Sequence, residues 1–183
     1  EAVSLCPGEY TVQNTLLDKD DKEIVILTTD VNLFENKSVI IQSHFVDKPH
    51  LWDIDDPYLY HVRTRILSGD TVKEEVFNTF GFRTFLFDCN KGFFLNGRNV
   101  KIQGACQHHD LGALGAAMNK SALRRQFEKL RAMGVNSVRT SRNMPAAEVM
   151  ELADEMGILI YSEALICGSL PRLPTTTAIS FPH

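Results

Sequence analysis

The apolar period of this chain changes between Lys91 and Asp110, and that change limits which folds the chain can adopt. Before it, short runs rich in Val, Ile, Phe and Thr alternate with turn clusters, which is typical of strands. After it, strand-like runs alternate with helical patterns. Two short apolar runs, Phe93–Leu95 and Val100–Gln103, flank Asn96-Gly97, a dipeptide that favours a tight hairpin turn. The second run is predicted to end at Gly104, followed by the polar cluster Gln107-His108-His109-Asp110.

The part before the change, residues 1–90, is predicted to form an immunoglobulin-like β-sandwich. Five strands are expected, with Asp18–Asp21 as the first hairpin turn: Tyr10–Leu17, Glu23–Thr28, Ser38–Val46, Tyr58–Leu67 and Thr71–Thr79. A sandwich of this type usually has about seven strands in about 100 residues. With five or six strands, this one is short by a strand.

The part after the change, residues 91–164, predicts strands joined by helices. Asn119 or Ser121 is expected to cap a helix that buries Leu123, Phe127 and Leu130, with Met133 extending that face. A strand over Val135–Arg139, a second helix and a strand over Ile158–Tyr161 follow. The second helix is expected over Ala146–Met156, with its buried side formed by Val149, Met150, Leu152, Ala153 and Met156. Residues 165–183, with three prolines and no helical period, are expected to be irregular.

Connections this short between strands and helices imply parallel strands. In such folds the polar loops after the carboxyl ends of the strands form the site. Here these loops carry Gln107–Asp110, Arg139–Asn143 and Ser162-Glu163. Three polar strand ends in succession favour the mouth of a barrel, and an open sheet covered by helices would obey the same rule.

The totals exclude several classes of partner and cofactor. A net charge of −4 and a pI near 5.9 give no electrostatic reason to expect a nucleic acid or an anionic membrane. No run approaches the roughly 18 apolar residues that span a bilayer. The four cysteines are scattered, and the acidic turn Asp18–Asp21 lacks the glycine and glutamate of a calcium loop. We therefore expect no metal, no cofactor and no disulfide framework.

Four motifs, in this order, resemble glycoside hydrolase family 2, the family of β-galactosidases, β-glucuronidases and β-mannosidases. Two motifs of its immunoglobulin-like domain have similar counterparts here. The first is Leu51-Trp52 followed by Asp56-Pro57-Tyr58-Leu59-Tyr60, and the second is Gly81-Phe82-Arg83. Phe94–Gly104 resembles the hairpin and first strand of its barrel, and Asn136–Ser141 with Asn143 and Pro145 resembles the second strand. The resemblance implies a sandwich followed by the first three β/α units of an incomplete (β/α)8 barrel.

Within the family, His108–Gly115 most resembles β-galactosidases, which implies a parent protein that hydrolyses terminal β-galactosides with retention. By resemblance, the substrate-binding residues are His109, Asp110, Arg139 and Asn143, and the supporting residues are His108, Arg142 and Glu163. Arg142 stands where the family usually has histidine. The family's two catalytic glutamates follow later strands, so this chain contains no catalytic residue and is expected to be inactive alone.

Several alternatives stay open at this stage. The chain could be a non-catalytic carbohydrate-binding or interaction module, or its parent could act on β-glucuronides or β-mannosides. Arg139 is expected to pair with Glu163 in this chain, one of the two histidines to be structural, and Trp52 to be sandwich core. Open strand edges predict self-association of the fragment. The first eight residues lack the regions of a secretory signal, and whether the parent is exported to the periplasm stays open.

Overall fold

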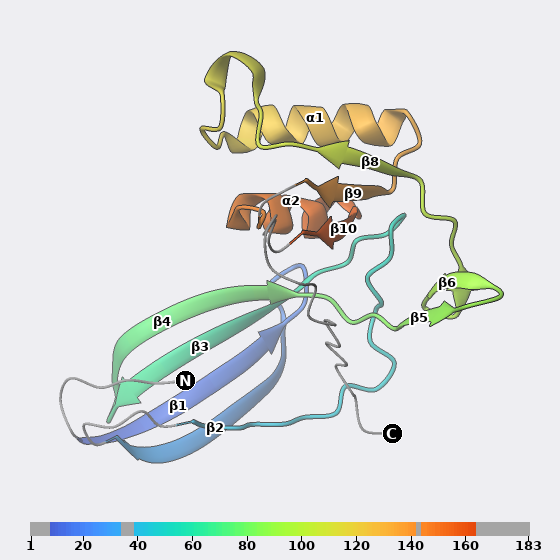
Figure 1. Cartoon of the computed structure of the whole chain (residues 1–183). Coiled ribbons are helices and arrows are strands. Elements are labelled where there is room, and N and C mark those ends of the chain that lie inside the picture. Colours follow the sequence, from blue (N-terminus) through green and yellow to red (C-terminus); the bar gives the residue numbers. More distant parts are fainter. Residues whose placement is uncertain (1–7, 34–38, 142–143, 164–183) are drawn as a thin grey trace, which may run out of the picture.

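The computed structural model describes residues 8–33, 39–141 and 144–163, and the fold below is that of these residues. Figure 1 shows two parts, an antiparallel sheet and a smaller part in which strands and helices alternate. A short hairpin lies beside the second part. The two parts follow one another in the sequence with the hairpin between them, so the change of period near Lys91 does mark a change of architecture.

Four long strands form the first part. They are β1 (Gly8–Leu17), β2 (Glu23–Leu33), β3 (Tyr60–Ser68) and β4 (Thr71–Phe80). All neighbours are antiparallel, in the order β2-β1-β3-β4. The turn between β1 and β2 is held by the Asp18 carboxylate, which accepts hydrogen bonds from the backbone N–H groups of Asp20 and Lys22, each at 2.9 Å. The hairpin turn predicted at Asp18–Asp21 is confirmed.

The strand predicted over Ser38–Val46 is wrong for the residues that the structure describes, 39–46, which form no regular element. Alternation alone does not make a strand, because the backbone also needs a neighbouring chain to pair with, and the described residues provide none here. Val39, Ile41 and Phe45 are 75%, 88% and 82% exposed. The Gln42 side chain bonds to the sheet by donating to Thr29 Oγ1 at 2.8 Å, and Val46 lines a cavity with residues of the sheet. The described part of this region is therefore one sheet rather than two layers.

The short hairpin between the two parts consists of three strands, β5 (Phe85–Asp88), β6 (Gly92–Leu95) and β7 (Arg98–Asn99). Asn96 and Gly97 have φ values of 51° and 77°, which confirms the predicted tight turn. The strand predicted over Val100–Gln103 is wrong, and the next strand begins only at Gly104. The Asn136 side chain explains this shift, since it accepts from the Gln103 N–H at 2.8 Å and donates to the Lys101 carbonyl at 2.9 Å.

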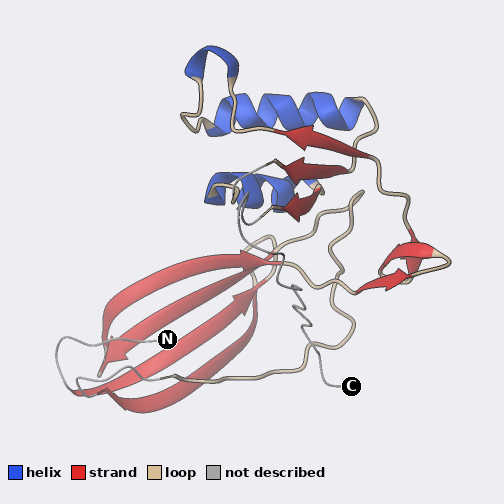
Figure 2. Ribbon diagram, viewed as in Figure 1, coloured by secondary structure: helices blue, strands red, loops and turns tan. Residues whose placement is uncertain are grey.

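The second part is a parallel sheet covered by two helices. Its strands are β8 (Gly104–Gln107), β9 (Ser137–Thr140) and β10 (Leu159–Ser162), in the order β10-β9-β8. The helices are α1 (Lys120–Ala132) and α2 (Ala147–Met156), and a 3-10 turn, η1 (Gly112–Leu114), precedes α1. Figure 2 shows how the helices accompany the short strands. Neither helix is long and apolar enough to cross a membrane within the described residues.

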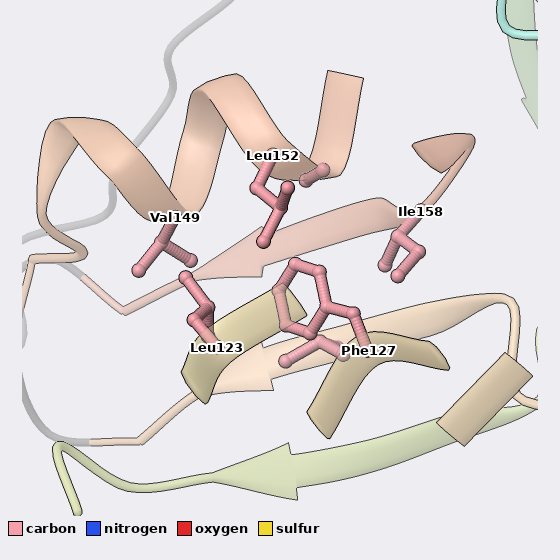
Figure 3. Close-up of a cluster of buried hydrophobic side chains, with 7 residues drawn as sticks. Leu123, Phe127, Val149, Leu152 and Ile158 are labelled. Carbon is pink, nitrogen blue, oxygen red and sulfur yellow. The ribbon is translucent and has the colours of Figure 1, made fainter. Parts of the chain in front are cut away.

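Both helices pack on the same face of β9, and their contact forms the main core. Phe127 of α1, Val138 of β9 and Leu152 of α2 have no exposed surface. Figure 3 shows that Phe127, Leu152 and their labelled neighbours point toward one another between the helices and the sheet. The side chains of Leu123, Phe127 and Leu130 therefore face the core as predicted, although Leu130 is only partly buried.

The helix ends follow local chemistry, with two corrections to the predicted faces. The Asn119 side chain caps α1 by accepting from the Ala122 N–H at 2.9 Å, and Gly157 ends α2 in the left-handed conformation. Met133 is 78% exposed because it is the C-cap of α1, beyond the buried stripe. Met150 is 40% exposed because it lies about 100° around α2 from Val149.

Trp52 is buried, as predicted, but it does not lie in a sandwich core. It is 2% exposed and packs with Ile54, Phe93, Leu95 and Val100, a second core cluster beside the α/β part. Phe93, Leu95 and Val100 lie just before or after the Asn96-Gly97 turn and do not belong to β1–β4. The prediction failed because the sequence motif around Trp52 carries no information about which neighbouring element the indole ring contacts.

Glu155 joins the two helices, and Glu155→Gln is expected to lower the free energy of unfolding by about 0.5–1 kcal/mol at pH 7, after allowing for solvent screening. Lys120 Nζ lies 3.2 Å from one Glu155 oxygen, and Arg124 binds the other. Partial burial raises the pKa of Glu155. The bonds from Arg124 and Lys120 lower it by more than burial raises it, so the pKa lies below the ordinary 4.5.

A lowered pKa in the folded state means that the stabilisation is fully present above pH 4.5 and is lost as the pH falls through the folded pKa. Urea unfolding of the wild type and Glu155→Gln across this range measures the loss, with Glu128→Gln, an exposed position on α1, as the control. A difference between wild type and Glu155→Gln that does not change with pH would contradict the prediction.

Candidate functional site

The open face of the parallel sheet carries a row of side chains near the carboxyl ends of its strands. Cys106 of β8 and Tyr161 of β10 are both in register with Arg139 of β9. Side chains at paired positions of neighbouring strands point to the same face, and alternate residues point to the other. The neighbours Val138 and Thr140 are buried under the helices. Arg139 therefore lies on the face without helices, between Cys106 and Tyr161.

Arg139 is held by two partners from the flanking strands. Its Nη2 lies 2.9 Å from the Glu163 carboxylate, and its Nη1 lies 3.6 Å from the Cys106 sulfur. Glu163 is positioned in turn by its own N–H, which donates to Thr140 Oγ1 at 3.3 Å. The Cys106 contact, followed by the charge of Glu163, raises the pKa of Arg139 above its ordinary value. The predicted pairing of Arg139 with Glu163 is confirmed, and the guanidinium stays charged.

The loop after β8 places His108, His109 and Asp110 apart from Arg139. All three side chains are exposed and line a small cavity of about 30 Å³, together with core residues such as Leu123 and Val149. A cavity of this size holds a water or two and no sugar ring. One oxygen of Asp110 also accepts from the Gly112 N–H at 2.7 Å, which fixes the turn into η1.

The structure thus brings together one predicted pair, Arg139 with Glu163, and a separate group of three, His108 to Asp110. Arg142 and Asn143 lie outside the described residues. Sequence reasoning missed Cys106 and Tyr161 as neighbours of Arg139. Alternation within each strand could have placed them on the open face, but only the register between strands aligns them with Arg139.

Among the described residues, this arrangement offers donors and acceptors that can bind polar groups. A fixed guanidinium can hold a carboxylate ionised or donate to hydroxyls. Retaining glycoside hydrolysis needs two carboxyl groups about 5–5.5 Å apart across the bond that is cleaved. In the row described above, Glu163 is the one carboxylate, and it is paired with Arg139. The described residues also contain no group of three or more His, Cys, Asp or Glu side chains that could hold a metal ion.

A parallel sheet whose strands follow one another in sequence order, with both helices on one face, is the arrangement with which a (β/α)8 barrel begins. Two family models match the chain: Glycosyl hydrolases family 2 over residues 6–83, and the TIM barrel domain of the same family over residues 89–173. The chain belongs to glycosyl hydrolase family 2.

Known relatives include enzymes for two kinds of sugar. The chain is 41% identical to the β-galactosidase BoGH2A of Bacteroides ovatus over 155 residues, which are 84% of the chain and 18% of that protein. It is 27% identical to a β-glucuronidase of Bacteroides fragilis over 191 aligned positions, 88% of the chain and 28% of the relative. The crystal structure of a Bacteroides uniformis β-glucuronidase aligns with a TM-score of 0.82 and 28% identity, covering 92% of the chain and 20% of that structure.

The chain therefore spans between 18% and 28% of the length of these relatives. It holds part of the N-terminal region of the family and the start of the barrel domain.

Proposed function

We propose that this chain is the piece of a retaining β-galactosidase that forms one wall of the sugar pocket. The observation that carries the proposal is the position of Arg139, which lies at the carboxyl end of a central parallel strand and is held in place by Glu163 at 2.9 Å. The 41% sequence identity to BoGH2A, a β-galactosidase, supports galactosides as the substrate class.

In the proposed site, each residue has a physical role. Arg139 keeps the catalytic nucleophile ionised, and His109, Asp110 and Asn143 bind sugar hydroxyls, for which they supply donors and acceptors. His108, Arg142 and Glu163 support them.

The proposed architecture is an immunoglobulin-like β-sandwich over residues 1–90, three β/α units of the barrel over 91–164 and an irregular segment over 165–183. In the region of the sandwich, β1–β4 form one sheet, so in this proposal the rest of the parent protein supplies the second sheet of the sandwich and the later barrel strands. Apolar side chains left uncovered, such as Phe87 at 68% exposed, favour self-association of the fragment. Light scattering of the 183-residue chain at increasing concentration measures it, and a monodisperse monomer contradicts it.

The 183-residue chain is expected to show no turnover of nitrophenyl β-galactoside, whereas the full-length protein hydrolyses it. The reason is that both catalytic glutamates lie on barrel strands that follow those of this chain. Release of nitrophenol by each protein is measured at equal concentration. Turnover by the pure fragment would show that the chain holds its own catalytic pair, and a full-length protein that cleaves no glycoside would overturn the proposal.

The similarity to β-glucuronidases makes glucuronides the second candidate substrate. A glucuronide differs from a galactoside by a carboxylate, which needs a cationic partner in the pocket. Comparing kcat/KM of the full-length protein for nitrophenyl β-galactoside and nitrophenyl β-glucuronide decides between them. Preference for the glucuronide would support the proposed glycosidase activity and change its proposed substrate from galactosides to glucuronides.

A further inference from the structure

The segment Leu51–Asp56 belongs by sequence to the N-terminal region, within the family match 6–83, yet its side chains are buried elsewhere. Trp52 and Ile54 are 2% and 7% exposed. They form one core cluster with Phe93, Leu95 and Val100, and Leu159 of β10 packs against it. Trp52 and Ile54 are therefore buried against the hairpin and the parallel sheet.

Hydrogen bonds from the α/β part hold the same segment. The Trp52 indole N–H donates to the Asp154 carbonyl of α2 at 2.8 Å. Arg131 at the end of α1 donates to the Ile54 carbonyl at 3.1 Å, and Asn96 of the hairpin turn donates to the Trp52 carbonyl at 3.0 Å. Both helices and the hairpin thus contact a segment that lies far from them in the sequence.

The antiparallel sheet holds the other side of Trp52. The Trp52 N–H donates to the Phe82 carbonyl at 2.8 Å, just after β4. A Cβ atom on Gly81 would lie 2.7 Å from the Trp52 Cβ, so the chain passes there in close contact. The Arg83 guanidinium lies 4.7 Å from the centre of the indole ring. Trp52 therefore contacts both the residues that follow β4 and the α/β part.

Gly157 shows how closely the segment is seated. A Cβ atom at this position would lie 2.2 Å from the Ile54 carbonyl oxygen, a separation that real Cβ atoms do not show. Gly134, which follows α1, has a similar left-handed φ of +85°, compared with +68° for Gly157. A Cβ on Gly134 would meet only the tip of the Gln103 side chain, at 3.8 Å. The two glycines share the backbone conformation and differ in the contact with Ile54.

We propose that the segment Leu51–Asp56 is a structural part of the barrel domain, and that it couples the folding of this domain to that of the antiparallel sheet. Its partner is the surface formed by the carboxyl ends of α1 and α2 and by the hairpin turn. A change in either part is then transmitted to the other through Trp52 and Ile54.

Gly157→Ala compared with Gly134→Ala tests the coupling in the 183-residue chain. Hydrogen exchange is measured at the amides of Trp52 and Asp53, which bond to Phe82 and Asp56. Gly157→Ala is expected to raise both exchange rates about 10-fold, since it displaces Ile54 and opens the segment locally. Gly134→Ala, which also places an alanine at a positive φ, is expected to leave them unchanged. Equal effects of the two variants, or no effect of Gly157→Ala, overturn the proposal.

Trp52→Phe tests the coupling in the opposite direction and decides the matter if Gly157→Ala does not fold. It keeps an aromatic ring and removes the N–H that binds Asp154. Both helices of the described residues lie in the α/β part, so ellipticity at 222 nm reports that part. A lower urea midpoint at 222 nm than in the wild type supports the proposal. An unchanged midpoint shows that the α/β part is independent of the segment and overturns it.

Discussion

Replacing Arg139 with alanine in the full-length protein is expected to lower kcat/KM for nitrophenyl β-galactoside by about 100-fold or more, as loss of a preorganised charged donor does in other sites. The guanidinium lies on the open face of the sheet and is held by Glu163 at 2.9 Å, and in the proposed site this face lines the substrate pocket. Without it, the nucleophile in the proposed site loses the charge that keeps it ionised.

Two variants separate this role from a general loss of charge. Arg139→Lys keeps the charge but loses the planar fork, and it is expected to recover only part of the activity. Arg124→Ala, on α1 and paired with Glu155, removes an arginine far from the open face and is expected to retain activity. Activity close to wild type in Arg139→Ala would place the pocket elsewhere. Loss of activity in all three variants would indicate unfolding.

Phe127→Ala is expected to lower the free energy of unfolding by about 3–5 kcal/mol, the usual cost of emptying a buried phenylalanine site. Phe127 has no exposed surface and belongs to one core cluster with Leu152 of α2 and Val138 of β9. The total stability of a domain is about 5–15 kcal/mol, and the described α/β part is only the start of one. The substitution therefore removes a large share of what holds the two helices together.

Urea unfolding followed at 222 nm measures this loss, because both helices of the described residues are in the α/β part. Phe127→Leu, which keeps an apolar side chain, is expected to lose much less. Met133→Ala, at the end of the same helix and 78% exposed, is the control for a change outside the core and is expected to unfold like the wild type. An equal loss in Met133→Ala and Phe127→Ala would mean that the helix face is assigned incorrectly.

Local chemistry was sufficient for the elements that depend on near neighbours in the sequence. Asp18 sets the first hairpin turn, Asn96-Gly97 sets the second, and Asn119 begins α1. Each acts through its own backbone conformation or through bonds to residues two to four positions away. The period of Leu123 and Phe127 likewise needs only the geometry of a helix.

Predictions failed where an element depends on a distant partner. Residues 39–46 alternate like a strand, but no neighbouring chain pairs with them among the described residues. The first parallel strand begins at Gly104 because Asn136, more than 30 positions later, occupies the backbone groups of Lys101 and Gln103. Such competition for backbone hydrogen bonds is invisible in a local pattern.

The sequence by itself determined the change from antiparallel strands to alternating strands and helices, the helix caps, and the polar residues that end each strand. Only the tertiary structure decided that Trp52 is buried against the barrel domain and that Cys106, Arg139 and Tyr161 form one row. The reason is physical. Period and capping are properties of a short stretch of backbone, whereas burial and register depend on which distant surfaces come into contact.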